Sequence, residues 1–144
     1  MPDDIPGHAT IAAAVRPPIA TGEIHATRWD FAQLVQQKAA AILQADAGVC
    51  GGITEWRKIA GLAAAHDIPV APHWLADIHV HLVASTPNAT WVEYFTDFSI
   101  INVGRLFRTQ LEVQGGGLAL PERAGLGVEL DEAAVQRYAM DGWA

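Results

Sequence analysis

Short apolar runs alternate with amphipathic stretches between residues 18 and 94. The apolar runs are residues 18–23 (PIATGE), 41–46 (AILQAD), 68–73 (IPVAPH) and 90–94 (TWVEY). In the stretches between them, apolar residues recur at the three- and four-residue spacing of a helix face. Strands that alternate with helices of this length are typical of βα units and a parallel sheet. The alternation therefore predicts an α/β fold built from four parallel βα units.

Local signals set the expected helix boundaries. Asp30-Phe-Ala-Gln33 resembles a capping box in which Asp30 caps the first helix. The second helix is expected from Ile53 to about His66, after the glycine-rich turn at 47–52, and the third from Leu75 to Thr86. Each of these helices follows one predicted strand.

The last third of the chain has a different pattern. Two short apolar segments, 111–113 and 118–120, flank the glycine-rich residues 114–117, and this arrangement predicts a hairpin. A turn-rich link then leads to a short helix at 131–139. We therefore divide the chain into a unit of four βα repeats at 1–96 and a C-terminal segment at 97–144.

Composition excludes several classes of protein. The 144 residues are 51% hydrophobic and 17% charged, which disfavours disorder. A net charge of −7 disfavours nucleic acid and anionic membranes as partners, because both require a basic surface. No apolar run approaches the ~18 residues needed to span a bilayer. The single cysteine, Cys50, and the acidic start without a signal-peptide pattern lead us to expect a globular protein of the cytoplasm.

Each predicted strand ends in an ionisable residue. These residues are Glu23, Asp46, His73 and Glu93, separated by 23, 27 and 20 residues, about one βα repeat each time. Because the carboxyl ends of parallel strands form one rim, we expect the four side chains to lie side by side. A glutamate there suits Mg²⁺, which prefers oxygen ligands. An aspartate bound to His73 would fix its tautomer and favour proton transfer.

Several other polar residues are weaker candidates for a function. His79 and His81 would face one side of a strand and could bind zinc there, but their neighbours have helical spacing, which favours two histidines of a helix without a metal. Cys50 could be a nucleophile only if His73 or another base reached it, and a structural thiol is the favoured interpretation. His25, Arg28 and Trp74 follow the ends of predicted strands, so they are candidates for substrate binding.

Four segments carry a resemblance to a known family. The segments PIATGE, ILQADAGVCGGITEWRKIAGLAAAHDIPVAPHW, VHLVASTPNATWVEYF and GLALPERAGLGVELDE are similar to the enolase superfamily, in particular its mandelate racemase subgroup. The resemblance covers nearly the whole chain from Met1. It implies the C-terminal half of a TIM-like (β/α)₇β barrel, in which Glu23 matches the third metal-binding carboxylate.

The same resemblance implies roles for the other three residues. Asp46 and His73 match an Asp–His dyad in which the histidine is a general acid or base, and Glu93 matches a glutamate that shares a hydrogen bond with a developing enediolate. The implied chemistry is removal of the proton next to a carboxylate, with Mg²⁺ stabilising the enediolate. Within this subgroup, the resemblance favours an acid-sugar dehydratase, and racemisation or epimerisation is the alternative.

Part of the family's sequence pattern has no counterpart in this chain. Nothing matches the first four barrel strands, which bear two further metal carboxylates, and a complete barrel of this kind needs roughly 250 residues. A half-barrel leaves two sheet edges unpaired. We therefore expect a fragment that is inactive alone, with a complementary N-terminal half or a homo-oligomer as partner. A non-catalytic remnant or assembly subunit is the alternative from another class.

Overall fold

The computed structural model describes residues 1, 3–96 and 103–140. The chain divides into two compact units, unit 1 at Met1–Glu93 and unit 2 at Tyr94–Ala144. Of the C-terminal segment predicted at 97–144, residues 97–102 and 141–144 lie outside the described residues.

The sheet of unit 1 is parallel. Strand β1 (Ala20–Thr21) pairs with β2 (Ile42–Leu43) in the register Ala20–Ile42 and Thr21–Leu43. Single parallel bridges then join Leu43 to Val70 and Val70 to Ala89. Four chain segments therefore lie next to one another in chain order, all running in the same direction.

Regular strand pairing is shorter than the sequence pattern predicts. Val70 makes only isolated bridges, because Pro69 and Pro72 on either side of it have no N–H group to donate to a ladder. On the last segment, the N–H of Thr90 donates to the carbonyl of Val70 at 2.9 Å, and no ladder extends beyond it. The first three apolar runs contain the paired residues but overstate the strand lengths, and the fourth run begins one residue after its bridge at Ala89.

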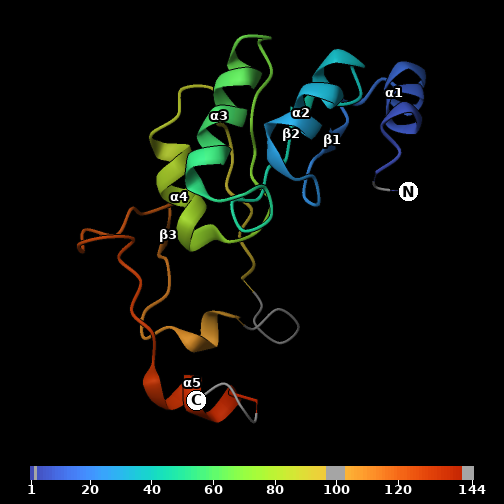
Figure 1. Ribbon diagram of the computed structural model, residues 1–144. Coiled ribbons are helices and arrows are strands. Elements are labelled where there is room, and N and C mark those ends of the chain that lie inside the picture. Colours follow the sequence, from blue (N-terminus) through green and yellow to red (C-terminus); the bar gives the residue numbers. More distant parts are fainter. Residues whose placement is uncertain (2, 97–102, 141–144) are drawn as a thin grey trace. The chain divides into compact units, whose positions relative to one another are not determined.

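Four helices belong to unit 1: α1 (Ile5–Ala14), α2 (Thr27–Gln36), α3 (Ile53–Ala64) and α4 (Ala76–Ala84). Helices α1, α2 and α3 follow one another in chain order along the unit (Figure 1). Helix α1 was not predicted, although its N-terminal signal is present in the sequence. The carboxylate of Asp4 accepts from the N–H of Gly7 at 2.9 Å, and Pro6 occupies the first turn.

The predicted capping box at Asp30 is wrong. Helix α2 starts three residues earlier, at Thr27, so Asp30 lies inside the helix. Its Oδ2 accepts from the N–H of Ala26, the residue before the helix, at 3.1 Å. Asp30 therefore binds a free N–H at the helix start from within the first turns, as the acidic partner of a capping box does.

The core of unit 1 lies between the helices and the sheet. Its fully buried side chains include Phe31 and Leu34 of α2, Trp56 and Ile59 of α3, and Leu43 and Val70 of the sheet. The indole N–H of Trp56 donates to the carbonyl of Ala45 at 2.9 Å, which ties α3 to the end of β2. Burial of this apolar face is what stabilises helices of this length.

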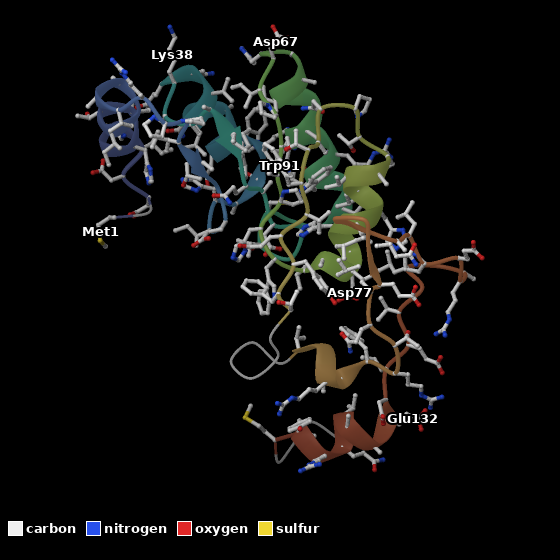
Figure 2. All side chains as sticks on the ribbon, turned by 180° about the vertical axis from the view of Figure 1, so that it is seen from behind. Met1, Lys38, Asp67, Asp77, Trp91 and Glu132 are labelled. Atoms are coloured by element: carbon white, nitrogen blue, oxygen red, sulfur yellow. The ribbon has the colours of Figure 1, made fainter. Side chains whose placement is uncertain are left out.

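The two ends of unit 1 have different connections. Lys38 and Asp67, at φ values of 54° and 56°, lie in the turns that follow α2 and α3, and Figure 2 shows both at the same end. Asp77, in the first turn of α4, lies at the opposite end. Strand-to-helix connections therefore gather at the Asp77 end, where Glu23, Asp46 and His73 follow their sheet segments.

Gly22, which precedes Glu23, has a backbone conformation and surroundings that favour glycine. Its φ is +141°, and a Cβ there would lie 2.8 Å from Cε1 of Phe31 and 3.0 Å from the backbone nitrogen of Gln44. We expect Gly22→Ala to destabilise the chain by about 1–3 kcal/mol, since both the backbone strain and the contact with fixed backbone oppose the new methyl group. Urea unfolding measures the loss.

Gly61→Ala is the matched control for Gly22→Ala. Gly61 lies in α3, and a Cβ there meets no atom within 4 Å. This variant should stabilise the chain by about 0.5–1 kcal/mol, because alanine favours a helix over glycine. Equal effects of the two substitutions would contradict the role given to Gly22.

Unit 2 contains shorter elements. They are the 3₁₀ helix η1 (Val103–Leu106), strands β3 (Val113–Gln114) and β4 (Gly117–Leu118), and helix α5 (Glu132–Tyr138). Strands β3 and β4 pair in antiparallel fashion around a turn with positive φ at Gly115 and Gly116, at the place where the sequence predicts a hairpin. Asp131 caps α5 by accepting from two backbone N–H groups.

No helix among the described residues is long and apolar enough to cross a membrane.

Candidate active site

Three of the four predicted rim residues meet at one place. Nδ1 of His73 lies 3.0 Å from Oδ2 of Asp46, and Nε2 of the same ring lies 3.5 Å from Oε2 of Glu23. Each residue lies two or three positions after a sheet segment of unit 1, which ends at Thr21, Leu43 or Val70. The parallel order of the segments therefore brings together side chains that are 23 and 27 residues apart in the sequence.

The Asp46 carboxylate fixes the orientation of the His73 ring. Its side chain is only 3% exposed, and its other oxygen, Oδ1, accepts from the N–H of Gly48 at 2.7 Å. Because a carboxylate can only accept, Nδ1 of His73 carries the proton of the bond to Asp46. In the neutral ring, Nε2 is then the basic nitrogen, and the His73 side chain is 28% exposed.

Glu93 and Trp74 lie next to this group. The backbone N–H of Trp74 donates to Oε2 of Glu93 at 2.8 Å, so the glutamate binds the peptide that directly follows His73. Glu93 is exposed, while Trp74 is half-buried, with its ring 6.3 Å from that of His73. The fourth rim residue thus contacts the loop of the third and not its side chain.

The contacts of His25 and Arg28 are with other residues. His25 is 5% exposed and packs edge-on against Phe31, and neither ring nitrogen has a hydrogen-bond partner among the described residues. Arg28 forms an ion pair with Glu55, with Nη1 at 2.7 and 3.0 Å from the two carboxylate oxygens. Neither contact joins these residues to His73.

The Arg28–Glu55 pair predicts a pH dependence of stability. The backbone N–H of Arg28, its guanidinium and the Lys58 ammonium all donate to Glu55 and lower its pKa from 4.5 to about 2. A carboxylate with a lowered pKa stabilises the fold above pH 4.5, and this contribution disappears as the pH falls towards 2.

We expect Glu55→Gln to lower the urea midpoint at pH 7, with a difference from the parent chain that shrinks below pH about 4.5. The exposed Glu122 supplies the control variant, Glu122→Gln, which should follow the parent chain at every pH. If the difference in urea midpoint between Glu55→Gln and the parent chain stays constant from pH 7 to pH 2.5, the lowered pKa of Glu55 does not contribute to stability as proposed.

Sequence reasoning missed the connecting role of His79. Helix α4 contains both His79 and His81, as the helical spacing predicted. His79 is fully buried and bonds to the backbone of Ala47 and of Trp74, directly after Asp46 and His73. The one available signal was a histidine within the predicted helix at 75–86, and this does not show what the ring binds.

The described residues do not supply a complete metal site. Nowhere among them are three or more His, Cys, Asp or Glu side chains grouped so that they could hold a metal ion. Glu23, whose side chain is 55% exposed, is the carboxylate open to such an ion at the site. A single carboxylate leaves most of the coordination of Mg²⁺ to other groups.

A family model described as "Enolase C-terminal domain-like" matches residues 1–134. The chain belongs to this family. L-talarate/galactarate dehydratase of Salmonella typhimurium is 40% identical to this chain over 131 residues. That match covers 91% of this chain and 32% of the relative.

Solved structures of the family agree with the fold. L-talarate dehydratase from Polaromonas sp. JS666, complexed with Mg and L-glucarate, is 36% identical at a TM-score of 0.81, with 94% of this chain and 37% of that chain covered. A racemase from Streptomyces coelicolor A3(2) with bound magnesium is 31% identical at a TM-score of 0.87, with 97% and 37% covered. This chain therefore spans about a third of the length of each of these three relatives.

Proposed function

We propose that this chain is the C-terminal half-barrel of a Mg²⁺-dependent acid-sugar dehydratase. The observation that carries the proposal is the Asp46–His73 pair, which leaves Nε2 of His73 free to move a proton beside Glu23. The four parallel segments agree with one half of a closed barrel. The dehydratase relatives and the Mg-bound structures support the reaction class.

His73 is the residue to which we assign proton transfer. In the proposed reaction, Nε2 takes the proton next to the carboxylate of a sugar acid while Asp46 holds Nδ1–H and stabilises the imidazolium that forms. Loss of the β-hydroxyl as water then gives an enol, which becomes a 2-keto-3-deoxy acid. The departing hydroxyl needs a proton to leave as water, and this proton can come from Nε2 of the same ring. His73 can thus serve as the base of the first step and as the acid of the second.

The other rim residues assist in different ways. Glu23 offers a carboxylate to Mg²⁺, and the site needs further ligands, since no three ligating side chains gather among the described residues. Glu93 holds the Trp74 peptide through Oε2. With one of several metal ligands, the purified chain with Mg²⁺ is expected to turn over no sugar acid.

Racemisation or epimerisation is the second candidate. The racemase from Streptomyces coelicolor, at a TM-score of 0.87, favours it. The two reactions share the abstraction by His73 and differ afterwards, because a racemase returns a proton to the same carbon and keeps the β-hydroxyl. The product distinguishes them: a keto acid for the dehydratase, and the stereoisomer of the substrate for the racemase.

The test supplies the part of the site that this chain lacks. We would fuse this chain to the segment of the Salmonella typhimurium relative that precedes its matched region, in place of that enzyme's own C-terminal part. The fusion is incubated with Mg²⁺ and galactarate in D₂O. We expect keto-acid formation and deuterium at the carbon next to the carboxylate. Neither product nor exchange from a folded fusion would contradict the proposed function.

A further inference from the structure

The imidazole of His79 joins the two loops that carry the proposed dyad. Its Nε2 lies 3.0 Å from the backbone nitrogen of Ala47, and its Nδ1 lies 2.6 Å from the carbonyl oxygen of Trp74. Ala47 directly follows Asp46, and Trp74 directly follows His73. We infer that His79 is a positioning residue that holds the Asp46 and His73 loops in register for proton transfer, an inference that rests on the proposed function.

The two contacts allow one protonation state of His79. The backbone N–H of Ala47 can only donate and the carbonyl of Trp74 can only accept. Nε2 of His79 is therefore unprotonated, and Nδ1 carries the proton. The ring is therefore neutral. Burial also lowers the pKa of His79, in agreement with a neutral ring. A neutral imidazole suits this place because it satisfies two buried backbone groups without adding a charge beside His73.

The Trp74 peptide needs such support. Trp74 and Leu75 have φ values of 48° and 35°, so two consecutive non-glycine residues adopt the left-handed conformation between His73 and α4. Such conformations cost free energy and persist where surrounding contacts hold them. His79 binds the Trp74 carbonyl, and Glu93 binds the Trp74 N–H. The orientation of the residue after His73 is therefore fixed from both sides.

The loop after Asp46 is equally dependent on its neighbours. A Cβ on Gly48 would lie 2.8 Å from Cδ1 of Leu75, which shows that the two loops approach closely. The N–H of Gly48 holds Asp46, and the N–H of Ala47 is held by His79. Displacement of the His79 ring would thus release one backbone group in each loop and lengthen the 3.0 Å separation between Asp46 and His73.

If His79 served only to fill space in the core, an apolar side chain would suit its position better. The ring of His79 is fully buried, 6.4 Å from the ring of Trp56, and an apolar ring would fill the same space without the cost of desolvating two nitrogens. Phenylalanine keeps the ring and removes both hydrogen bonds. It therefore separates the packing of His79 from its bonds to the loops.

The test follows the His73–Asp46 bond directly in the full chain labelled with ¹⁵N-histidine. The Nδ1–H of His73 should give an exchange-protected imidazole signal in the parent chain, and this signal should disappear in folded His79→Phe. His66→Phe is the matched control, because His66 is exposed beyond α3, and it should keep the signal. A folded His79→Phe chain that keeps the signal unchanged would overturn the inference.

A second pair of variants keeps the inference falsifiable if His79→Phe fails to fold. His79→Asn retains a donor near the position of Nδ1 for Trp74, and His79→Gln retains an acceptor near the position of Nε2 for Ala47. Each should weaken the His73 signal, and in the active fusion each should lower kcat about 10-fold or more with KM changed less than twofold. Lower urea midpoints with the signal and kcat both unchanged would overturn the inference.

The two readouts separate this inference from the proposed function. The histidine signals need no substrate, so an inactive fusion contradicts the dehydratase proposal while the spectra still decide the role of His79. An active fusion whose kcat and His73 signal are insensitive to His79 leaves the reaction in place and removes His79 as a positioning residue.

Discussion

His73→Asn is expected to abolish deuterium incorporation next to the substrate carboxylate in the fusion described above. Asparagine is close in size to the imidazole and can still donate to Asp46, but it has no nitrogen that takes up a proton at neutral pH. General acid–base catalysis typically contributes 10²–10⁴-fold, so we expect a fall of at least about 10²-fold in exchange and in keto-acid formation. Both are measured by NMR on the same sample.

The control for this prediction is a histidine outside the rim. His66 is exposed after the end of α3, and His66→Asn should leave exchange within twofold of the parent fusion. Far-ultraviolet circular dichroism and urea midpoints establish that both variants are folded. Retained exchange in a folded His73→Asn fusion would remove His73 from the proton-transfer step.

Trp56→Ala is expected to cause the largest loss of stability. Trp56 is fully buried in α3 and its indole N–H binds the carbonyl of Ala45, one residue before Asp46. Truncation of a buried aromatic residue to alanine typically costs 3–5 kcal/mol, through lost burial and the cavity that remains. Because domains of this size are stable by only about 5–15 kcal/mol, unit 1 should be largely destabilised.

Urea unfolding of two further variants separates the contributions at Trp56. Trp56→Phe keeps most of the packing but leaves the Ala45 carbonyl without its donor, so it should cost about 1–3 kcal/mol. Trp91→Ala is the surface control, since Trp91 is 64% exposed, and it should change stability by no more than about 0.5 kcal/mol. Similar losses for Trp56→Ala and Trp91→Ala would contradict the core position of Trp56.

The sheet and the rim follow from short-range patterns in the sequence. Apolar runs at intervals of one βα repeat place Leu43 and Val70 on neighbouring parallel segments, as observed, whereas the fourth run was predicted from Thr90, one residue after the bridge at Ala89. The residues that end these runs then lie at the same edge. For this reason the contact between Asp46 and His73 could be predicted without a structure, although the two residues are 27 positions apart.

Element lengths and starts were predicted less well. Prolines at 69 and 72 interrupt the ladder around Val70, and a pattern of apolar residues does not register the missing N–H groups. Helix α1 is apolar without a clear hydrophobic stripe, so its periodicity gave no signal, and only Asp4 and Pro6 marked its start. These differences arise where backbone hydrogen bonding, rather than side-chain burial, decides where a helix starts or how far a strand extends.

The sequence by itself predicted neighbouring parallel segments from its strand–helix alternation, and it predicted that Glu23, Asp46 and His73, which follow three of them, lie close together, as they do in the structure. Only the tertiary structure decided which partners the remaining polar groups take. Arg28 binds Glu55 across 27 residues, and His79 binds Ala47 across 32. Such bonds depend on side-chain directions in the packed fold, and no local pattern encodes them.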